Sequence, residues 1–252
     1  MSWNMAKCGA FMQGFFFLLL LSFFMTGCAG GKQSTAPVTA TAEAPADSLK
    51  AKFSITIHSE DGKSQDLDAV LFSVPNKRYR MELTGALGIG VASLLWLEDG
   101  WQMVFPTEKM YMKGAGYMVG LVYDTSLPLV HIHQVAGLFE GKVLPEKFEE
   151  ISSRDTLGFK VHEIRDGAGR HYTYGEKDGD IAWLETLGRD GKNEILAIQE
   201  FKEFEGVKTP SKISFIRDGV LFLDIRVKKV QHKKPFGTGT WRLNIPRSYQ
   251  RM

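Results

Sequence analysis

An alternation of apolar and polar residues, which begins near residue 49 and recurs to residue 229, is the feature that most constrains the fold. Residues 52–57, reading KFSITI, show the pattern plainly, because every second residue is apolar. Side chains of a β-strand point alternately to opposite faces of a sheet, so this pattern predicts strands that are buried on one face. Asp-Gly pairs such as residues 99–100 and 218–219 separate these segments and favour hairpin turns.

The strand pattern is interrupted between residues 117 and 139. Apolar residues there fall at helical spacing, at Leu129, Ile132, Val135, Ala136 and Phe139. Pro128 suits a first helical turn, and Gly141 follows the expected helix end. The whole pattern predicts a mainly β fold, a curled antiparallel half-barrel of about 10–11 strands with a short central helical segment plugging the concave face.

The start of the chain has the features of a secreted precursor. Lys7 provides a positive charge, and residues 15–24 are almost continuously apolar. A run of this length is too short to span a bilayer comfortably and is typical of a signal peptide. Thr26 and Gly27 precede Cys28 in a segment that resembles a bacterial lipobox, which implies cleavage after Gly27 and a lipid on Cys28. The alternative is an ordinary signal peptide, or an uncleaved anchor, in which Cys28 has no role.

We therefore expect a signal peptide over residues 1–27, a lipid anchor and flexible linker over residues 28–47, and a folded domain over residues 48–252. The linker is mainly Ala, Thr, Ser, Gly and Pro, which bury too little apolar surface to offset the entropy lost on ordering. One of the two cysteines, Cys8, lies in the predicted signal peptide, so the expected mature chain forms no internal disulfide. A net charge of +2 does not indicate a nucleic-acid partner.

The connection between two predicted strands at residues 85–90, reading GALGIG, is unusually apolar for a turn. Connections usually run over the wet surface and are rich in polar residues. One interpretation is a protruding loop in which Leu87 and Ile89 contact lipid. The alternative is a tight hairpin in which both side chains fold back into the core.

The strand RYRMEL at residues 78–83, which leads into this Leu-Gly loop, resembles the LolA/LolB superfamily, and LolB in particular. The segments LPL at residues 127–129 and LFEGKVLP at residues 138–145 resemble the family's later segments, and the predicted anchor is that of LolB. The resemblance implies that Leu87 matches the leucine by which the family puts lipoproteins into the membrane. Ala86 stands where the family often has Pro, and the segment from Phe236 onward has no counterpart in the pattern.

The resemblance implies a lipid-binding domain that accepts acylated lipoproteins from a LolA-like periplasmic carrier and inserts them into outer-membrane lipid. Ala29, in place of a retention Asp, suggests delivery to the periplasmic face of the outer membrane, and a monomer is expected. The alternative is a lipid-anchored binding module of the same fold that serves another hydrophobic ligand or an envelope complex.

Aromatic, aliphatic and methionine side chains of the predicted sheet and helix are candidates for an acyl-chain cavity. Each buried methylene of a ligand gains about 0.8 kcal/mol, and methionine adapts to variable ligands. The candidates are Phe53, Ile55, Tyr79, Met81, Trp96, Trp101, Met103, Phe105, Ile132 and Phe139. The alternative for each is an ordinary core position.

Residues that would carry catalysis or hold a cofactor are not indicated. His131 and His133 lie two apart on a predicted helix and so would not share a face for a metal. A Gly-x-Ser-x-Gly nucleophile motif is missing from the sequence. We expect no enzyme, no metal and no cofactor. The basic cluster at residues 226–234, RVKKVQHKK, is interpreted either as a solvated face or as a surface for anionic headgroups.

Overall fold

The computed structural model describes residues 48–59, 61–115, 132–188 and 190–252. All the described residues belong to one compact unit, Thr41–Met252. The predicted signal peptide, Cys28 and the linker lie outside the described residues, as do Pro128, Leu129 and His131.

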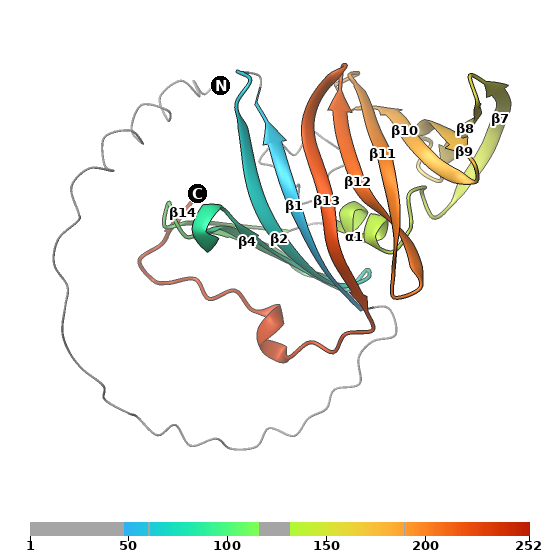
Figure 1. The fold of residues 1–252 in the computed structure, drawn as a ribbon. Coiled ribbons are helices and arrows are strands. Elements are labelled where there is room, and N and C mark those ends of the chain that lie inside the picture. Colours follow the sequence, from blue (N-terminus) through green and yellow to red (C-terminus); the bar gives the residue numbers. More distant parts are fainter. Residues whose placement is uncertain (1–47, 60, 116–131, 189) are drawn as a thin grey trace. The chain divides into compact units, whose positions relative to one another are not determined.

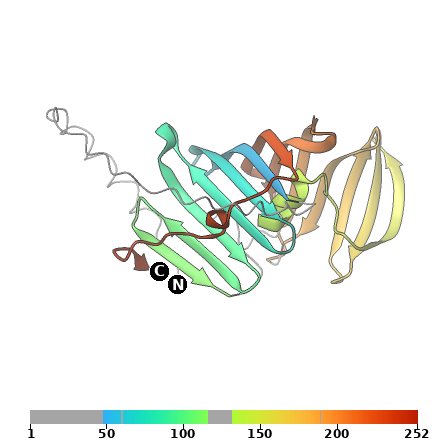
Figure 2. The ribbon, with the colours of Figure 1, turned by 90° about the horizontal axis from the view of Figure 1, so that it is seen from below.

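Within the described residues, one open sheet of 14 strands forms the domain (Figures 1 and 2). The strands are β1 (Leu49–His58), β2 (Ser64–Val74), β3 (Arg78–Thr84), β4 (Gly90–Leu97), β5 (Gly100–Phe105), β6 (Met110–Gly114), β7 (Phe148–Thr156), β8 (Phe159–Asp166), β9 (His171–Lys177), β10 (Asp180–Leu187), β11 (Asn193–Phe204), β12 (Val207–Arg217), β13 (Val220–His232) and β14 (Gln250–Arg251). Their order in the sheet is β14-β6-β5-β4-β3-β2-β1-β13-β12-β11-β10-β9-β8-β7.

Two antiparallel meanders meet at the centre of this sheet. Strands β1 to β6 form one wing, and β7 to β13 form the other. The wings join where β1 pairs with β13, in a register that sets Ile55 opposite Ile225. Strand β14 is the exception to the antiparallel pattern, because it pairs with β6 in parallel. The predicted curled antiparallel sheet with one short helix is confirmed.

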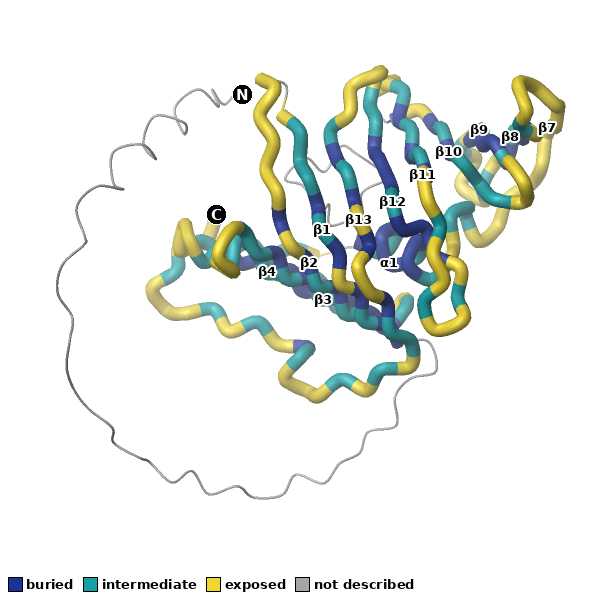
Figure 3. The backbone as a smooth tube through the Cα atoms, in the orientation of Figure 1, coloured by how far each residue is buried: buried dark blue, intermediate teal, exposed yellow. Residues whose placement is uncertain are grey.

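The core lies on the sheet face that carries α1 (Ile132–Phe139). Alternation along β1 buries Phe53 and Ile55 on this face, as the sequence pattern predicts. Helix α1 is short but almost wholly apolar, and it buries Ile132 and Phe139 against the sheet. Figure 3 shows the buried positions concentrated in α1 and the strands next to it.

The last residues, 233–252, form what we call the C-terminal strap, which packs on the opposite face of β2, β3 and β4. It contains a 3-10 turn, η4 (Thr238–Trp241), and ends in β14. A second apolar cluster joins the strap to the sheet and consists of Val74, Leu95 and Trp241 with Phe72, Leu97, Phe236 and Leu243. Arg80 also donates to strap carbonyls, at 2.8 Å from Thr240 and 3.1 Å from Arg242. The segment without a place in the family pattern therefore has a structural role.

The structure has more strands than the predicted 10–11, and two of them had no sequence signal. Strand β7, reading FEEISSRDT, is exposed along its whole length and lacks the apolar alternation of a half-buried strand. Strand β14 is two residues long and depends on its pairing with β6. Both lie at the ends of the sheet, where pairing on one side is enough.

Candidate functional site

The connection between β3 and β4, residues 85–89, forms a compact protruding turn that we call the hook. The backbone N–H of Gly85 donates to the Ile89 carbonyl at 2.8 Å, and a 3-10 turn, η2 (Ala86–Gly88), lies between them. Leu87 has φ 59° and ψ 18°, and Gly88 has φ 73°. Two successive residues with positive φ are typical of the tight turns that fit the twist of a β-hairpin.

The two apolar side chains of the hook point into solvent. Leu87 is 97% exposed and Ile89 is 55% exposed. The interpretation in which both side chains fold back into the core does not describe this structure. Leu87 also occupies the left-handed region, which costs a non-glycine residue about 1–2 kcal/mol. A leucine that is exposed in this conformation contributes little to the packed core.

A second leucine, which the sequence reasoning missed, has the same local geometry. Leu157 joins β7 to β8, has φ 49°, precedes Gly158 with φ 79°, and is 94% exposed. In the sequence, this turn is marked by a Leu-Gly pair between two strands. Because neighbouring strands from β3 to β7 are antiparallel, the end of β3 and the start of β7 lie on the same side of the sheet. Leu157 follows the end of β7, so it lies on the side opposite the hook. Leu157 lacks a neighbour like Ile89, since Phe159 is half-buried.

The ten residues predicted to line an acyl-chain cavity all lie in one hydrophobic cluster. Seven are buried in it, namely Phe53, Ile55, Tyr79, Met81, Trp96, Ile132 and Phe139, and three are partly buried against it, namely Trp101, Met103 and Phe105. The sequence therefore identified side chains of a single apolar face. Their binding of an acyl chain stays a prediction.

A small apolar pocket of about 160 Å³ opens within this face. Met81, Met103 and Phe105 line it, together with Ile57 and Leu83. A cavity of about 150 Å³ holds a molecule the size of benzene. A long acyl chain is larger than this space.

On β9, two tyrosines extend the apolar surface toward the far wing. Burial raises the pKa of Tyr172 and of Tyr174 above the ordinary value, because a charged phenolate is poorly solvated there. His162 stacks on Tyr174, with ring centroids 4.6 Å apart, and its Nδ1 lies 3.2 Å from Glu150 Oε2. Neutral phenols in this region keep the surface compatible with an uncharged ligand.

Of the two histidines considered for a metal, His131 lies outside the described residues and His133 lies in α1. Among residues 48–59, 61–115, 132–188 and 190–252, no group of three His, Cys, Asp or Glu side chains is arranged to hold a metal ion. His133 instead packs near aromatic rings, 5.8 Å from Tyr79 and 6.1 Å from Trp96 between ring centroids. Within the same described part, no helix has the length and apolar character to cross a membrane.

The basic cluster at residues 226–234 lies mostly on the face opposite α1. Arg226, Lys228 and Lys229 are exposed, while Val227 and Val230 between them are buried. This alternation matches the prediction of a solvated strand face. Two of the exposed cations, Arg226 and Lys228, also line a polar pocket that the sequence did not reveal.

No protein-family model matches the chain, and no curated protein matches it. Solved structures do resemble it in fold. A DUF1329 family protein from Desulfovibrio piger superposes with a TM-score of 0.56 at 9% identity, covering 78% of this chain and 90% of that one. An outer membrane lipoprotein-sorting protein domain from Vibrio parahaemolyticus, described as putative, gives a TM-score of 0.55 at 8% identity, with coverage of 78% and 90%.

A LolA superfamily protein from Nitrosomonas europaea gives a TM-score of 0.54 at 9% identity and covers 79% of this chain and 91% of its own. At this level of identity the likeness shows a shared fold. The chain therefore has the open half-barrel fold seen in LolA-superfamily and lipoprotein-sorting structures. The closer resemblance to LolB stays a prediction.

Proposed function

We propose that this protein is an outer-membrane lipoprotein that accepts acylated lipoproteins from a LolA-like periplasmic carrier and inserts them into outer-membrane lipid. The observation that carries the proposal is the hook, in which Leu87 is 97% exposed on a turn closed by its own backbone. When an apolar side chain that is exposed on a hairpin enters a bilayer, its transfer out of water lowers the free energy. In the proposal, Leu87 and Ile89 contact lipid while β3 and β4 hold them in place.

The apolar face that carries α1 supports the acyl-chain part of the proposal. A lipoprotein acyl chain must stay out of water between the carrier and the membrane, and each buried methylene contributes about 0.8 kcal/mol. Met81 and Met103 border the small pocket and can change rotamer to follow a chain of variable shape. The pocket is small at rest, so we propose that cargo enters as α1 moves away from the sheet.

The predicted lipid on Cys28 supports the location. A lipid anchor followed by a flexible linker holds the domain close to one leaflet, and Ala29 favours the outer membrane. Likeness of fold to a lipoprotein-sorting domain is consistent with this location. We propose that the protein works as a monomer, by binding and release alone, without enzymatic activity, metal or cofactor.

The test is depletion of the protein in its native host, followed by fractionation of the membranes. Other lipoproteins should accumulate on the carrier or fail to reach the outer membrane. Complementation with Leu87→Glu should express a folded protein that does not restore delivery. Leu157→Glu is the matched control, because it places the same charge at the same kind of exposed turn, and it should restore delivery. Normal delivery in the depleted cells would refute the proposal.

A second candidate function is favoured by the small size of the apolar pocket. A space of about 160 Å³ suits a compact hydrophobic ligand better than a long acyl chain. In that case the protein is a lipid-anchored binding module of the same fold. Mass spectrometry of the protein purified under native conditions separates the two functions, because a compact co-purified ligand and no affinity for acylated peptide would favour the binding module.

A further inference from the structure

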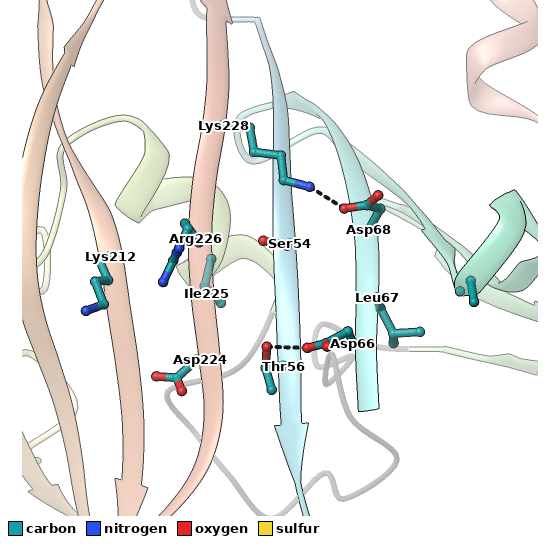
Figure 4. A pocket seen from close by; sticks show the side chains of 12 residues that line it. Ser54, Thr56, Asp66, Leu67, Asp68, Lys212, Asp224, Ile225, Arg226 and Lys228 are labelled. Atoms are coloured by element: carbon teal, nitrogen blue, oxygen red, sulfur yellow. Dashed lines mark hydrogen bonds and ion pairs between the residues drawn. The ribbon is translucent and has the colours of Figure 1, made fainter. Parts of the chain in front are cut away.

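The sheet face opposite α1 carries an open polar pocket of about 560 Å³ that extends from β12 to the hook (Figure 4). Pockets that bind small molecules span roughly 300–1,000 Å³, so this one has the size of a binding site. Ser54 and Thr56 of β1 form its floor, and Gly85 and Ala86 of the hook form one rim. Most of the lining is polar, and Leu67 is shared with the small apolar pocket.

The strand registers align the pocket with the hook. Lys212 lies opposite Arg226, Arg226 lies opposite Ser54, Ser54 lies opposite Asp68, and Asp68 lies opposite Thr84. These five residues form one continuous row across β12, β13, β1, β2 and β3. Thr84 is the last residue of β3, directly before the hook. A ligand bound at Lys212 and Arg226 would therefore lie on the same face of the sheet as the base of the hook.

Two of the pocket's carboxylates already have partners. Lys228 Nζ donates to Asp68 Oδ1 at 2.5 Å, and Thr56 Oγ1 donates to Asp66 Oδ1 at 2.6 Å, and both contacts are drawn in Figure 4. These contacts place a cation or a donor on each carboxylate. The ammonium of Lys228 neutralises Asp68, whereas the hydroxyl of Thr56 satisfies Asp66 without cancelling its charge.

The third carboxylate, Asp224, is also satisfied. Ser214 Oγ donates to Asp224 Oδ1 at 2.5 Å, and His58 Nε2 lies 3.0 Å from Asp224 Oδ2. Both oxygens of Asp224 are thus occupied. Figure 4 shows this side chain below Arg226, on the same strand.

Lys212 and Arg226 are the remaining two cations of the pocket lining. They face each other across β12 and β13, and within the described residues no ion pair or hydrogen bond joins either side chain to a carboxylate. The nearby Glu200, opposite Lys212 in β11, instead pairs with Lys202 at 3.3 Å. Like charges directly opposite each other destabilise a sheet, so this pair has a cost that an anion placed between them would remove.

We propose that this pocket binds the phosphodiester headgroup of an anionic membrane lipid. The guanidinium of Arg226 offers donors that match two phosphate oxygens, and Lys212 adds a second positive charge at the same place. Ser54 supplies a neutral hydroxyl next to Arg226 for the glycerol part of a headgroup. Because the hook forms the pocket rim, a lipid whose acyl chains contact Leu87 presents its headgroup to these cations. The inference rests on the proposed membrane contact of the hook and adds the class of lipid that it meets.

The test is a titration of the full chain in non-ionic detergent micelles with glycerophosphoglycerol, a water-soluble lipid headgroup, followed by calorimetry. The double variant Lys212→Gln/Arg226→Gln should weaken binding by about tenfold or more, as expected when charge-assisted hydrogen bonds are lost. The matched control is Lys52→Gln/Lys229→Gln, which removes two facing cations that are not part of the pocket lining. The control should bind the headgroup like the wild type, and all variants should keep the wild-type melting temperature.

Equal weakening by the two double variants would overturn the proposal, because it would indicate a diffuse basic surface. Inorganic phosphate that binds as tightly as glycerophosphoglycerol would also overturn it, in favour of a site for free anions. If the wild type does not bind the headgroup while Leu87→Glu still blocks lipoprotein delivery, the pocket proposal fails and the proposed function stands.

Discussion

The ring of Phe139 in α1 packs edge-on against the ring of Phe53 in β1, with centroids 4.8 Å apart. This contact holds the helix on the apolar face of the sheet, and both side chains are fully buried. Any cargo that enters between α1 and the sheet must separate these two rings. In the proposed function, this contact is therefore a point at which the stability of the domain and the binding of cargo oppose each other.

Phe139→Ala should lower the free energy of unfolding by about 3–5 kcal/mol, which is typical for loss of a buried phenylalanine. Urea denaturation followed by tryptophan fluorescence measures the change. Phe148→Ala, at an exposed position on the edge strand β7, is the control and should change stability by less than about 0.5 kcal/mol. Equal effects of the two substitutions would mean that α1 does not depend on the Phe53–Phe139 contact.

Leu87→Asn should preserve or raise stability while it abolishes lipoprotein delivery. Asn tolerates the left-handed conformation that Leu87 adopts, so the free energy of unfolding should stay the same or increase by up to about 1 kcal/mol. Leu157→Asn is matched in conformation and exposure and should give the same shift in stability without loss of delivery. A marked drop in the stability of Leu87→Asn would indicate that Leu87 packs into the core in solution.

Arg80→Met should release the C-terminal strap. The Arg80 guanidinium donates to the carbonyls of Gly239, Thr240 and Arg242, and hydrogen bonds from charged groups contribute about 1.5–3 kcal/mol. Limited proteolysis should cut the strap sooner in this variant, and denaturation should show a loss of that order. Arg165→Met is the control, since its ion pair with Glu149 is exposed and contributes about 0–1 kcal/mol. Equal proteolysis rates would contradict the role of Arg80.

Stability should fall at alkaline pH through Tyr174. Burial raises the folded-state pKa of this phenol above its ordinary value of 10.0. The folded state then holds the proton more tightly than the unfolded chain. This contribution is present below pH 10.0 and is lost as the pH rises through the folded-state pKa. Tyr174→Phe should show a smaller loss of stability between pH 9 and pH 11 than the wild type, by denaturant titration at each pH. An unchanged loss would assign the effect to other groups.

Much of the sheet and its apolar face was predictable from period-two alternation, because one buried face is enough to impose that pattern. Phe53, Ile55 and Met81 were identified from alternation alone, and all lie in the core cluster. Strand β7 was not predictable, since it is exposed on both faces and its residues show no alternation. The apolar composition of residues 85–90 indicated an unusual turn. The exposure of Leu87 depends on backbone angles that the amino-acid sequence does not specify directly.

The polar pocket was not predictable from the sequence. Lys212, Arg226 and Asp68 come from three separate strands and meet only through the strand registers. The register of β1 with β13 shifts at an irregularity between Lys52 and Phe53, so a count of alternating residues does not reproduce it. Local patterns give the face that a residue occupies, but the partners across the sheet depend on pairings between distant segments.

The pairing of β1 with β13 has a consequence for how the protein is made. Ser48 Oγ donates to the carbonyl of Lys234 across a sequence separation of 186 residues, so the central seam of the sheet joins the two ends of the domain. Contacts between residues so far apart in sequence form slowly, because the entropy of closing a long loop is lost before the contact stabilises the chain. Until β13 emerges, β1 stays an open edge that can pair with other chains. A chain that stops before β13 is thus expected to aggregate.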